Sequence, residues 1–305
     1  METVYVVSAK RTPIGSFMGQ LSSLPAPQLG AAAIKSAVET AGLSPDAIDE
    51  VILGNVLTAG VGQAPARQAA LGAGLPVSTP CMTINKVCGS GLKAVMLATD
   101  SLKLGHSHVA IAGGQENMSL APHLLQNSRT GYRMGHVSAK DSMVLDGLWD
   151  PYNDWHMGNA AELCVKEYKF SREQQDEFAK KSYEKSQRSQ SEGHFKNELC
   201  TVEVPQRKQT LTVGMDEEPT RVKFDKIPEL RPAFDKSGSV TAANASTIND
   251  GGCALVLATE SAVKQHGLKP LAKIVTHSTY AQDPKWFTTA PVGAMRAALE
   301  KANLK

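Results

Sequence analysis

Short apolar runs and longer amphipathic stretches alternate along the first 120 residues. Four runs rich in branched apolar residues have the length of β-strands, at residues 3–8, 50–56, 81–85 and 108–113. Between them, three Ala- and Gly-rich segments have helical spacing, at residues 28–42, 65–73 and 90–104. This alternation predicts an α/β fold, in which helices cover both faces of a largely parallel or mixed sheet.

The middle of the chain differs in composition and in hydrophobic periodicity. Residues 121–160 are rich in Gly, His, Asp and Tyr and show little periodicity. The apolar run that starts at Ala254 resumes the earlier pattern. We therefore predict that residues 121–248 are an inserted loop domain, and that residues 1–120 and 249–270 together form a first domain.

One amphipathic helix is predicted inside this insertion. Ser171 is a suitable N-cap, and helical spacing continues to about Gln190. Phe178 and Tyr183 are among the apolar positions of this helix. Residues 205–236, which follow, are polar and carry four prolines.

An internal repeat links the two ends of the chain. The segment AIKSAVETAGL at residues 33–43 matches AMRAALEKANL at residues 294–304, with five of eleven positions identical. Each segment follows a strand candidate, the second of which covers residues 271–275. The repeat predicts that a second copy of the first domain begins near residue 271 and is interrupted after its first helix, so that residues 271–305 are an incomplete domain.

Composition narrows the classes of function. Apolar residues make up 42% and charged residues 20% of the 305 residues, as in an ordinary globular protein. The net charge of +2 gives no reason to expect nucleic acid as a partner. No uninterrupted apolar stretch reaches about 18 residues, so a membrane span is not expected.

The cysteines and the first residues indicate a compartment. Five cysteines, none in a C-x-x-C pair, argue against a disulfide framework or a zinc site and favour reducing surroundings. Residues 1–8 lead directly into an alternating strand pattern, with no signal or transit sequence. We therefore expect a cytoplasmic location and no bound metal.

The sharpest chemical feature is Asn85-Lys-Val-Cys88-Gly-Ser-Gly91. Here a predicted strand ends and a predicted helix begins, with a cysteine at the junction. A helix N-terminus offers partial positive charge and free N–H groups, and both favour a thiolate. Gly89 and Gly91 leave room for an acyl group close to the backbone, where the N–H of Cys88 can donate to a developing oxyanion.

This segment resembles the nucleophile motif of the thiolase family, Asn-x-x-Cys-x-Ser-Gly. Four further elements of that family occur in the same order along the chain. They are Arg11-Thr-Pro-Ile-Gly15, Gly113-Gly-Gln-Glu-Asn-Met-Ser119, His156-Met-Gly158 and Asn244-Ala-Ser-Thr-Ile-Asn-Asp-Gly251. The resemblance covers essentially the whole chain and implies the thiolase fold, a duplicated domain in αβαβα layers with an inserted loop domain.

The resemblance also implies roles for individual residues. Cys88 is similar to the family's nucleophile, which is acylated by a CoA thioester. His156, Met157, Ala243 and Ser246 are similar to residues that line the pantetheine channel. Arg221 is similar to the basic residue near the nucleotide end, where a diphosphate and a 3′-phosphate need cationic partners. Coenzyme A is then a substrate, and no cofactor is bound permanently.

The implied reaction is the condensation of two acetyl-CoA molecules to acetoacetyl-CoA, or the reverse thiolysis. Transfer of an acetyl group from one thiol to another loses little free energy, and the acyl-enzyme stays reactive, so ping-pong kinetics follow. The His-Met-Gly element resembles the short-chain thiolases. The family also implies a homodimer or homotetramer, with residues 131–135 as candidate tetramer contacts.

Three further thiolase elements, Asn-Glu-Ala-Phe, Gly-His-Pro and Cys-x-Gly, do not occur between Leu271 and Lys305. In the family these supply the oxyanion-binding water, the histidine that activates the nucleophile and the acid/base cysteine. Together with the interrupted repeat, this predicts a truncated thiolase that is impaired by itself.

Parts of the sequence invite three other interpretations. Gly60-Val-Gly62 invites a nicotinamide-dependent oxidoreductase, but Pro65 breaks the glycine pattern and the next strand runs into Asn85 and Lys86 instead of an acidic residue. A related condensing enzyme, such as a ketoacyl or hydroxymethylglutaryl-CoA synthase, lacks the strings at 113–119 and 244–251 in this form. A non-catalytic thiolase-like fragment that binds CoA or a partner chain is a third alternative, and acylation of Cys88 distinguishes it from a working enzyme.

Overall fold

The computed structural model describes residues 2–305, which form two compact units. The first unit comprises the described residues up to Gly147 together with residues 197–215 and 249–273, and the second comprises residues 148–196, 216–248 and 274–305. The sequence-based division at 120, 248 and 270 stays a prediction about family domains. Within the described residues, no helix combines the length and apolar composition that a membrane crossing requires.

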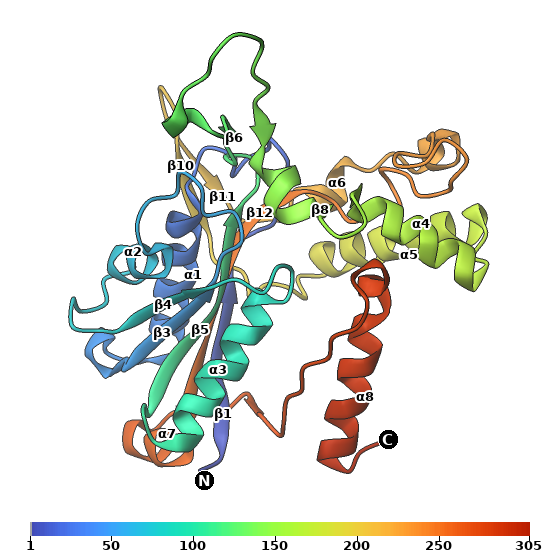
Figure 1. Ribbon diagram of the computed structural model, residues 1–305. Helices are drawn as coiled ribbons and strands as arrows, with labels where there is room; N and C mark the ends of the chain where they lie inside the picture. Colours follow the sequence, from blue (N-terminus) through green and yellow to red (C-terminus); the bar gives the residue numbers. More distant parts are fainter. Residues whose placement is uncertain (1) are drawn as a thin grey trace. The chain divides into compact units, whose positions relative to one another are not determined.

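A mixed sheet of seven strands organises the first unit (Figure 1). Its main path has the order β13-β1-β12-β5-β3-β4, and the short β2 pairs with β12. β3 is parallel to both β4 and β5, whereas β12 is antiparallel to β1 and β5. The strands are β1 (Val4–Arg11), β2 (Gly15–Ser16), β3 (Glu50–Gly54), β4 (Cys81–Ile84), β5 (Val109–Asn117), β12 (Asn249–Thr259) and β13 (Ala272–Lys273).

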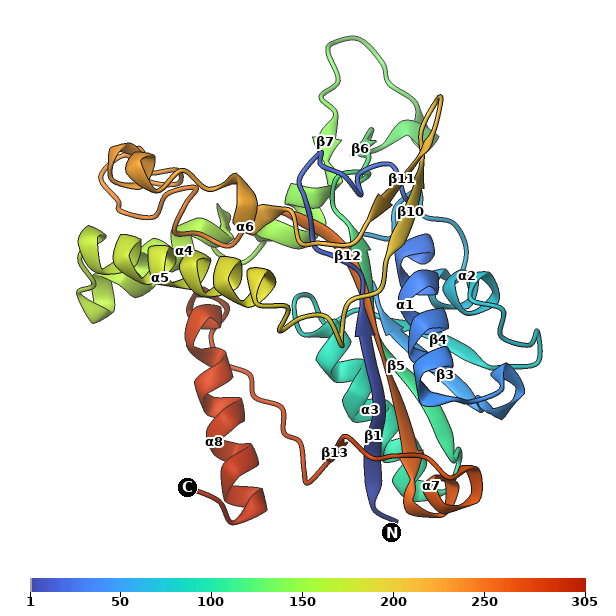
Figure 2. The same cartoon turned by 180° about the vertical axis from the view of Figure 1, so that it is seen from behind.

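Helices cover both faces of this sheet, as the sequence pattern predicted. α1 (Ala26–Ala41) and α2 (Pro65–Gly72) pack together on one face, where Figure 2 shows them side by side. α3 (Ser90–Leu104) packs on β3 and β5 from the other face, and the short α7 (Glu260–His266) follows β12. The three predicted helices and four predicted strands of the first 120 residues are therefore confirmed, with shifts of a few residues.

Alternation along the strands separates the two faces chemically. Val51, Leu53 and Ile111 belong to the core beneath α1 and α2. Ala110 and Ala112, which are fully buried, alternate with that set and point to the other face. Small side chains on this face let α3 lie close to β5, which brings the start of α3 near the strand ends.

β5 is longer than the predicted strand at 108–113, since it continues through Asn117. Two glycines inside it explain the difference. A Cβ at Gly113 would lie 2.1 Å from the carbonyl oxygen of Cys253 on β12, and Gly114 lies against Gly91 of α3. These glycines allow the close approach of neighbouring backbones, so the strand continues past them.

The repeated segments at 33–43 and 294–304 end in the same capping structure. Gly42 after α1 and Asn303 after α8 (Ala290–Ala302) are both left-handed, with φ of 69° and 54°. In each case the following leucine N–H reaches back to a carbonyl five residues earlier, Val38 or Leu299. The burial differs, because α1 has eight buried residues and α8 has none.

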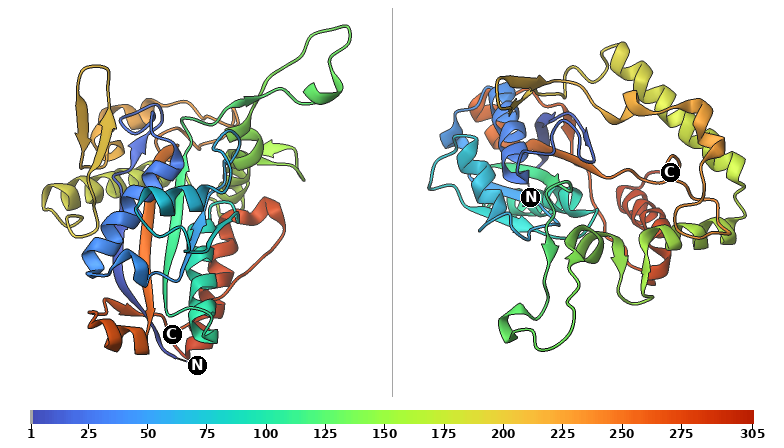
Figure 3. Two further views of the ribbon diagram at one scale, coloured as in Figure 1. Left: turned by 90° about the vertical axis from the view of Figure 1, so that its left-hand side faces the viewer. Right: turned by 90° about the horizontal axis from the view of Figure 1, so that it is seen from above.

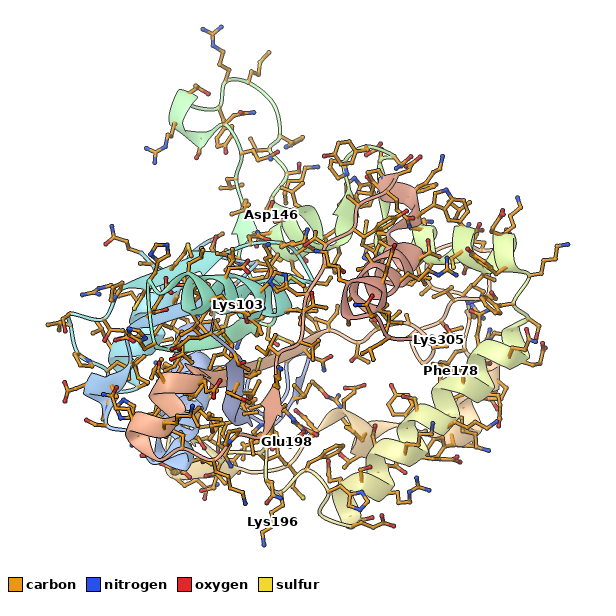
Figure 4. All side chains as sticks on the ribbon, turned by 90° about the horizontal axis from the view of Figure 1, so that it is seen from below. Lys103, Asp146, Phe178, Lys196, Glu198 and Lys305 are labelled. Carbon is orange, nitrogen blue, oxygen red and sulfur yellow. The ribbon has the colours of Figure 1, made fainter. Side chains whose placement is uncertain are left out.

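The second unit contains α4 (Met157–Tyr168), α5 (Arg172–Ser191), α6 (Glu218–Arg221) and α8. Ser171 is the N-cap of α5, as predicted, and it forms a capping box with Gln174. The apolar face expected of this helix is only partly real. Phe178, labelled in Figure 4, is 78% exposed, whereas Tyr183 is partly buried.

Shorter elements complete the chain. β10 (Val202–Pro205) and β11 (Thr210–Val213) form a hairpin that Figure 3 shows projecting from the first unit, and it overlaps the start of the polar stretch at 205–236. The strand predicted at 271–275 is only the two-residue β13 at the sheet edge beside β1. The remaining short pieces are η1 (Pro45–Ala47), β6 (His123–Leu124), η2 (Ser128–Thr130), β7 (Lys140–Asp141), η3 (Met143–Leu148), β8 (Trp149–Asp150), β9 (Trp155–His156), η4 (Phe224–Glu229) and η5 (Pro284–Thr289).

Candidate active site

Cys88 lies in the turn between β4 and α3, where the sequence placed it. It precedes Gly89, the N-cap residue of α3, and it is exposed. The other four cysteines, Cys81, Cys164, Cys200 and Cys253, are only partly exposed and also free. Burial raises the pKa of Cys81, Cys200 and Cys253. Cys88 is therefore the most accessible thiol of the chain.

Glycines from two neighbouring strands support this turn. A Cβ at Gly54, the last residue of β3, would lie 2.5 Å from the Cβ of Ser90. On the other side, Gly91 packs against Gly113 and Gly114 of β5 at distances of 3.6–3.8 Å, measured to a Cβ built on Gly91. The start of α3 thus rests directly on the backbone of β3 and β5.

Glu116 fixes the loop that continues from Gly54. Its carboxylate accepts hydrogen bonds from the N–H of Val56 at 2.7 Å, the N–H of Leu57 at 3.1 Å and the side-chain amide of Asn55 at 2.7 Å. Burial raises the pKa of this carboxyl, and the three donors oppose that rise without cancelling it.

His156 caps a helix in the second unit. Its Nδ1 accepts the N–H of Gly158 at 3.0 Å, and Asn159 reaches back to the N–H of His156 at 3.2 Å. The ring stacks on Phe234, with centroids 4.8 Å apart. Desolvation lowers the pKa of His156, so the neutral ring is favoured. Because Nδ1 is an acceptor here, the neutral ring carries its proton on Nε2, where it can donate to a ligand.

The segment around Ala243 is a turn held by side chains of the same unit. The Oδ1 of Asn244 accepts the N–H of Thr241 at 2.7 Å, and its amide donates to Asp176 on α5 at 2.9 Å. Asp176 also pairs with Arg172 at 2.7 Å. Ala243 is half-buried in this turn, and Ser246, three residues on, is exposed.

The six residues predicted for the site fall in both units. Cys88 belongs to the first unit, and His156, Met157, Arg221, Ala243 and Ser246 belong to the second. Met157 is the first residue of α4, directly after His156. Arg221 ends α6, where its side chain is about half exposed and lies 3.6 Å from the carboxylate of Glu217.

Comparisons with known proteins identify the family. Residues 4–261 match the family model described as the thiolase N-terminal domain. This chain is a thiolase. It is 51% identical to the acetyl-CoA acetyltransferase of Cupriavidus necator over 99% of its own length and 77% of that protein. It is likewise 51% identical to the mitochondrial acetyl-CoA acetyltransferase B of Xenopus laevis, covering 73% of it.

Solved structures agree on the fold of the thiolase. The acetyl-CoA acetyltransferase of Bacillus anthracis matches with a TM-score of 0.97 and 38% identity, over all of this chain and 77% of that one. A thiolase from Ascaris suum, solved in complex with coenzyme A, matches with a TM-score of 0.94 and 40% identity, over 78% of its length. The predicted fold class is confirmed.

Two surface pockets of the thiolase are lined by none of the six predicted site residues. One, of about 390 Å³, lies in the first unit between α1, α2 and β10. The other, of about 490 Å³, lies in the second unit and is lined by aromatic residues of α4 and its C-terminal end, by Cys164 and by Arg296 of α8. Among the described residues, no group of three or more His, Cys, Asp or Glu could hold a metal ion.

Glu116 and Asn55, which hold the loop after β3, were not predicted from the sequence. A signal was available, because Glu116 is an acidic residue inside the apolar strand β5, where a buried charge requires several donors. The three donors come from residues 55–57, which precede Cys88 by about thirty positions. Only the parallel pairing of β3 with β5 brings them together.

Proposed function

We propose that this thiolase transfers acetyl groups between coenzyme A and carbon, condensing two acetyl-CoA molecules to acetoacetyl-CoA and CoA or catalysing the reverse thiolysis. The observation that carries the proposal is the single exposed thiol, Cys88, at the start of α3. Relatives at about half identity bear the name acetyl-CoA acetyltransferase. Their names and this position of the cysteine support the same chemistry.

The first half-reaction needs only acyl exchange at Cys88. The Sγ thiolate attacks the carbonyl carbon of acetyl-CoA, a new thioester forms, and the C–S bond to CoA breaks, so that CoA leaves as a thiolate. The negative charge on the carbonyl oxygen during attack requires N–H donors at the helix start. In the second half-reaction a base takes a proton from the α-carbon of another acetyl-CoA, and that carbon attacks the acetyl carbonyl. The C–C bond forms as the C–S bond to Cys88 breaks, which returns Cys88 as a thiolate.

The second unit is proposed to hold coenzyme A. His156 donates from Nε2 to the pantetheine amide region, with Met157, Ala243 and Ser246 beside it, and Arg221 faces the phosphates. Hydrogen bonds within the second unit support this proposal. The capping bond to Gly158 fixes the His156 ring and its tautomer, and the bonds of Asn244 hold the Ala243 turn. Coenzyme A acts as substrate, and no permanent cofactor is proposed.

The test is the intact mass of the purified chain before and after exposure to acetyl-CoA. We expect one added acetyl group, located on Cys88 by peptide mapping. Cys88→Ala should lose the adduct, while Cys81→Ala, a matched change on neighbouring β4, should keep it. An adduct that survives Cys88→Ala, or no adduct in the wild type, would overturn the proposed role of Cys88.

Binding and turnover separate the remaining alternatives. Retention of coenzyme A without acylation would identify a non-catalytic CoA-binding chain. Thiolysis of acetoacetyl-CoA in the same preparation tests the expectation that residues 1–305 by themselves are impaired. Strong thiolysis would refute that expectation and leave the proposed reaction intact.

Assembly and location are proposed with the same activity. A homodimer or homotetramer is proposed, with residues 131–135 among the tetramer contacts, where Met134 is fully exposed and Tyr132 is 42% exposed. Sedimentation analysis tests the state of assembly. Five free thiols fit a reducing compartment, and the cytoplasm is the proposed location.

A further inference from the structure

The residue directly before the proposed nucleophile has an unfavourable backbone conformation. Val87 has a φ of +45°, in the left-handed region that β-branched residues avoid. Six other non-glycine residues of the described chain have positive φ, and none of them is β-branched. Val87 is also 48% exposed, so burial of its side chain does not compensate for the strain.

Two polar side chains hold Val87 in this conformation. The Oδ1 of Asn85 accepts the N–H of Val87 at 2.9 Å. The hydroxyl of Ser90 accepts the N–H of Lys86 at 2.7 Å and donates to the carbonyl of Val87 at 2.6 Å. Ser90 therefore bonds to the backbone on both sides of the Lys86–Val87 peptide link, while Asn85 satisfies the N–H within it.

Ser90 is itself fixed in place. It is 4% exposed, begins α3, and lies against Gly54 so closely that a Cβ there would be 2.5 Å from the Ser90 Cβ. Its N–H also donates to the carbonyl of Val87 at 3.0 Å. The position of the Val87 carbonyl is thus set by a residue that cannot move without displacing β3 or α3.

We propose that Ser90 and Asn85 are positioning residues that hold the strained Val87 and thereby direct the Cys88 thiol outward at the start of α3. Strained backbone persists only where its surroundings over-determine it, and such sites cluster where side chains must be presented for chemistry. The inference rests on the proposed role of Cys88 as the nucleophile. It predicts that loss of either side chain lets the turn relax and lowers the reactivity of Cys88.

The first measurement is the rate at which iodoacetamide alkylates Cys88, resolved by peptide mapping. Ser90→Ala should lower this rate by about tenfold, because it removes both hydrogen bonds of the Ser90 hydroxyl, each of which is worth roughly a few-fold in an equilibrium. Alkylation of Cys81 in the same sample should be unchanged. Ser101→Ala, a serine near the other end of the same helix that bonds to Ser107, should leave the Cys88 rate as it is.

A rescue experiment separates positioning from packing. Glycine adopts positive φ without strain, so Val87→Gly should let the turn keep its shape without the hydrogen bonds of Ser90. Val87→Gly in the Ser90→Ala background should restore most of the lost rate. If the double variant stays as slow as Ser90→Ala, or if Ser90→Ala does not slow alkylation, Ser90 has no positioning role and the inference is wrong.

Asn85 provides a second route if Ser90→Ala disturbs folding. Asn85 is exposed, so Asn85→Ala should fold, and it should slow alkylation of Cys88 in a way that Val87→Gly also rescues. An unchanged rate in Asn85→Ala would overturn its part of the inference. Alkylation requires no coenzyme A. Fast alkylation without acetylation would therefore refute the proposed function and leave the positioning inference standing.

Discussion

At the scale of single residues, His156 combines a structural bond with a proposed ligand contact. His156→Ala removes the acceptor for the Gly158 N–H and should destabilise the fold by about 1 kcal/mol. His156→Asn keeps a side-chain acceptor that suits an N-cap, so it should recover most of that loss. Urea unfolding of the three proteins at pH 7.5 measures the difference. Equal stability of the Ala and Asn variants would show that the cap contributes little.

The same histidine predicts a pH dependence. Its folded pKa lies below the ordinary value of 6.5 because burial disfavours the charged ring, and protonation would also remove the Nδ1 acceptor. The unfolded chain therefore takes up this proton first, and the stability from neutral His156 is complete above pH 6.5 and declines as the pH falls below it. The unfolding free energy of wild type should therefore fall relative to that of His156→Asn as the pH drops through that range. A constant difference would contradict this.

At the scale of elements, Glu116 joins β5 to the loop after β3. Glu116→Gln replaces one of its oxygens with an amide N–H₂ that faces N–H donors, so it should destabilise the fold by about 1–3 kcal/mol. Glu198→Gln provides a control, because Glu198, labelled in Figure 4, is an exposed partner of Arg11. That change should cost less than about 1 kcal/mol. Similar losses of unfolding free energy in both variants would show that the hydrogen bonds of Glu116 contribute little to stability.

The raised pKa of Glu116 fixes the sign of its pH effect. The folded state holds this proton more tightly than the unfolded state, whose carboxyl has the ordinary value of 4.5. As the pH rises above 4.5 through the folded pKa, ionisation of the half-buried group removes part of the stability. The advantage of wild type over Glu116→Gln should therefore be largest near pH 4.5 and smaller at pH 7. Urea midpoints across this range test it.

Elements with strong local signals were predictable from the sequence. α3 was expected at 90–104 and occupies those residues, because an Ala-rich amphipathic pattern follows a glycine turn. The Ser171 cap was predictable for the same reason, since its partner Gln174 lies in the same turn of sequence. The exposure of Phe178 was not, because an apolar residue at helical spacing does not reveal which neighbours reach it.

At the scale of the whole molecule, the order of the motifs indicated the family. The contacts between segments that are distant in the sequence could not be predicted from it. The position of Cys88 at the junction of β4 and α3 was predictable because its motif is continuous from 85 to 91, and its role as a site residue stays a prediction. The hydrogen bonds of Glu116 join residues about sixty positions apart, and no local sequence pattern predicts that contact. The conformation of Val87 was also hidden, since its side chain gives no hint of positive φ.

The fold should make Cys88 more reactive than the other four cysteines of the chain. In the native state one thiol should react with a disulfide reagent about ten times faster than the others, because only Cys88 is exposed and burial raises the pKa of three of its four counterparts. In urea all five should react at similar rates. Cys88→Ala should lack the fast native phase and keep four thiols in urea. A fast phase that survives this change would place the reactive thiol elsewhere, and the proposed acyl transfer would lose its nucleophile.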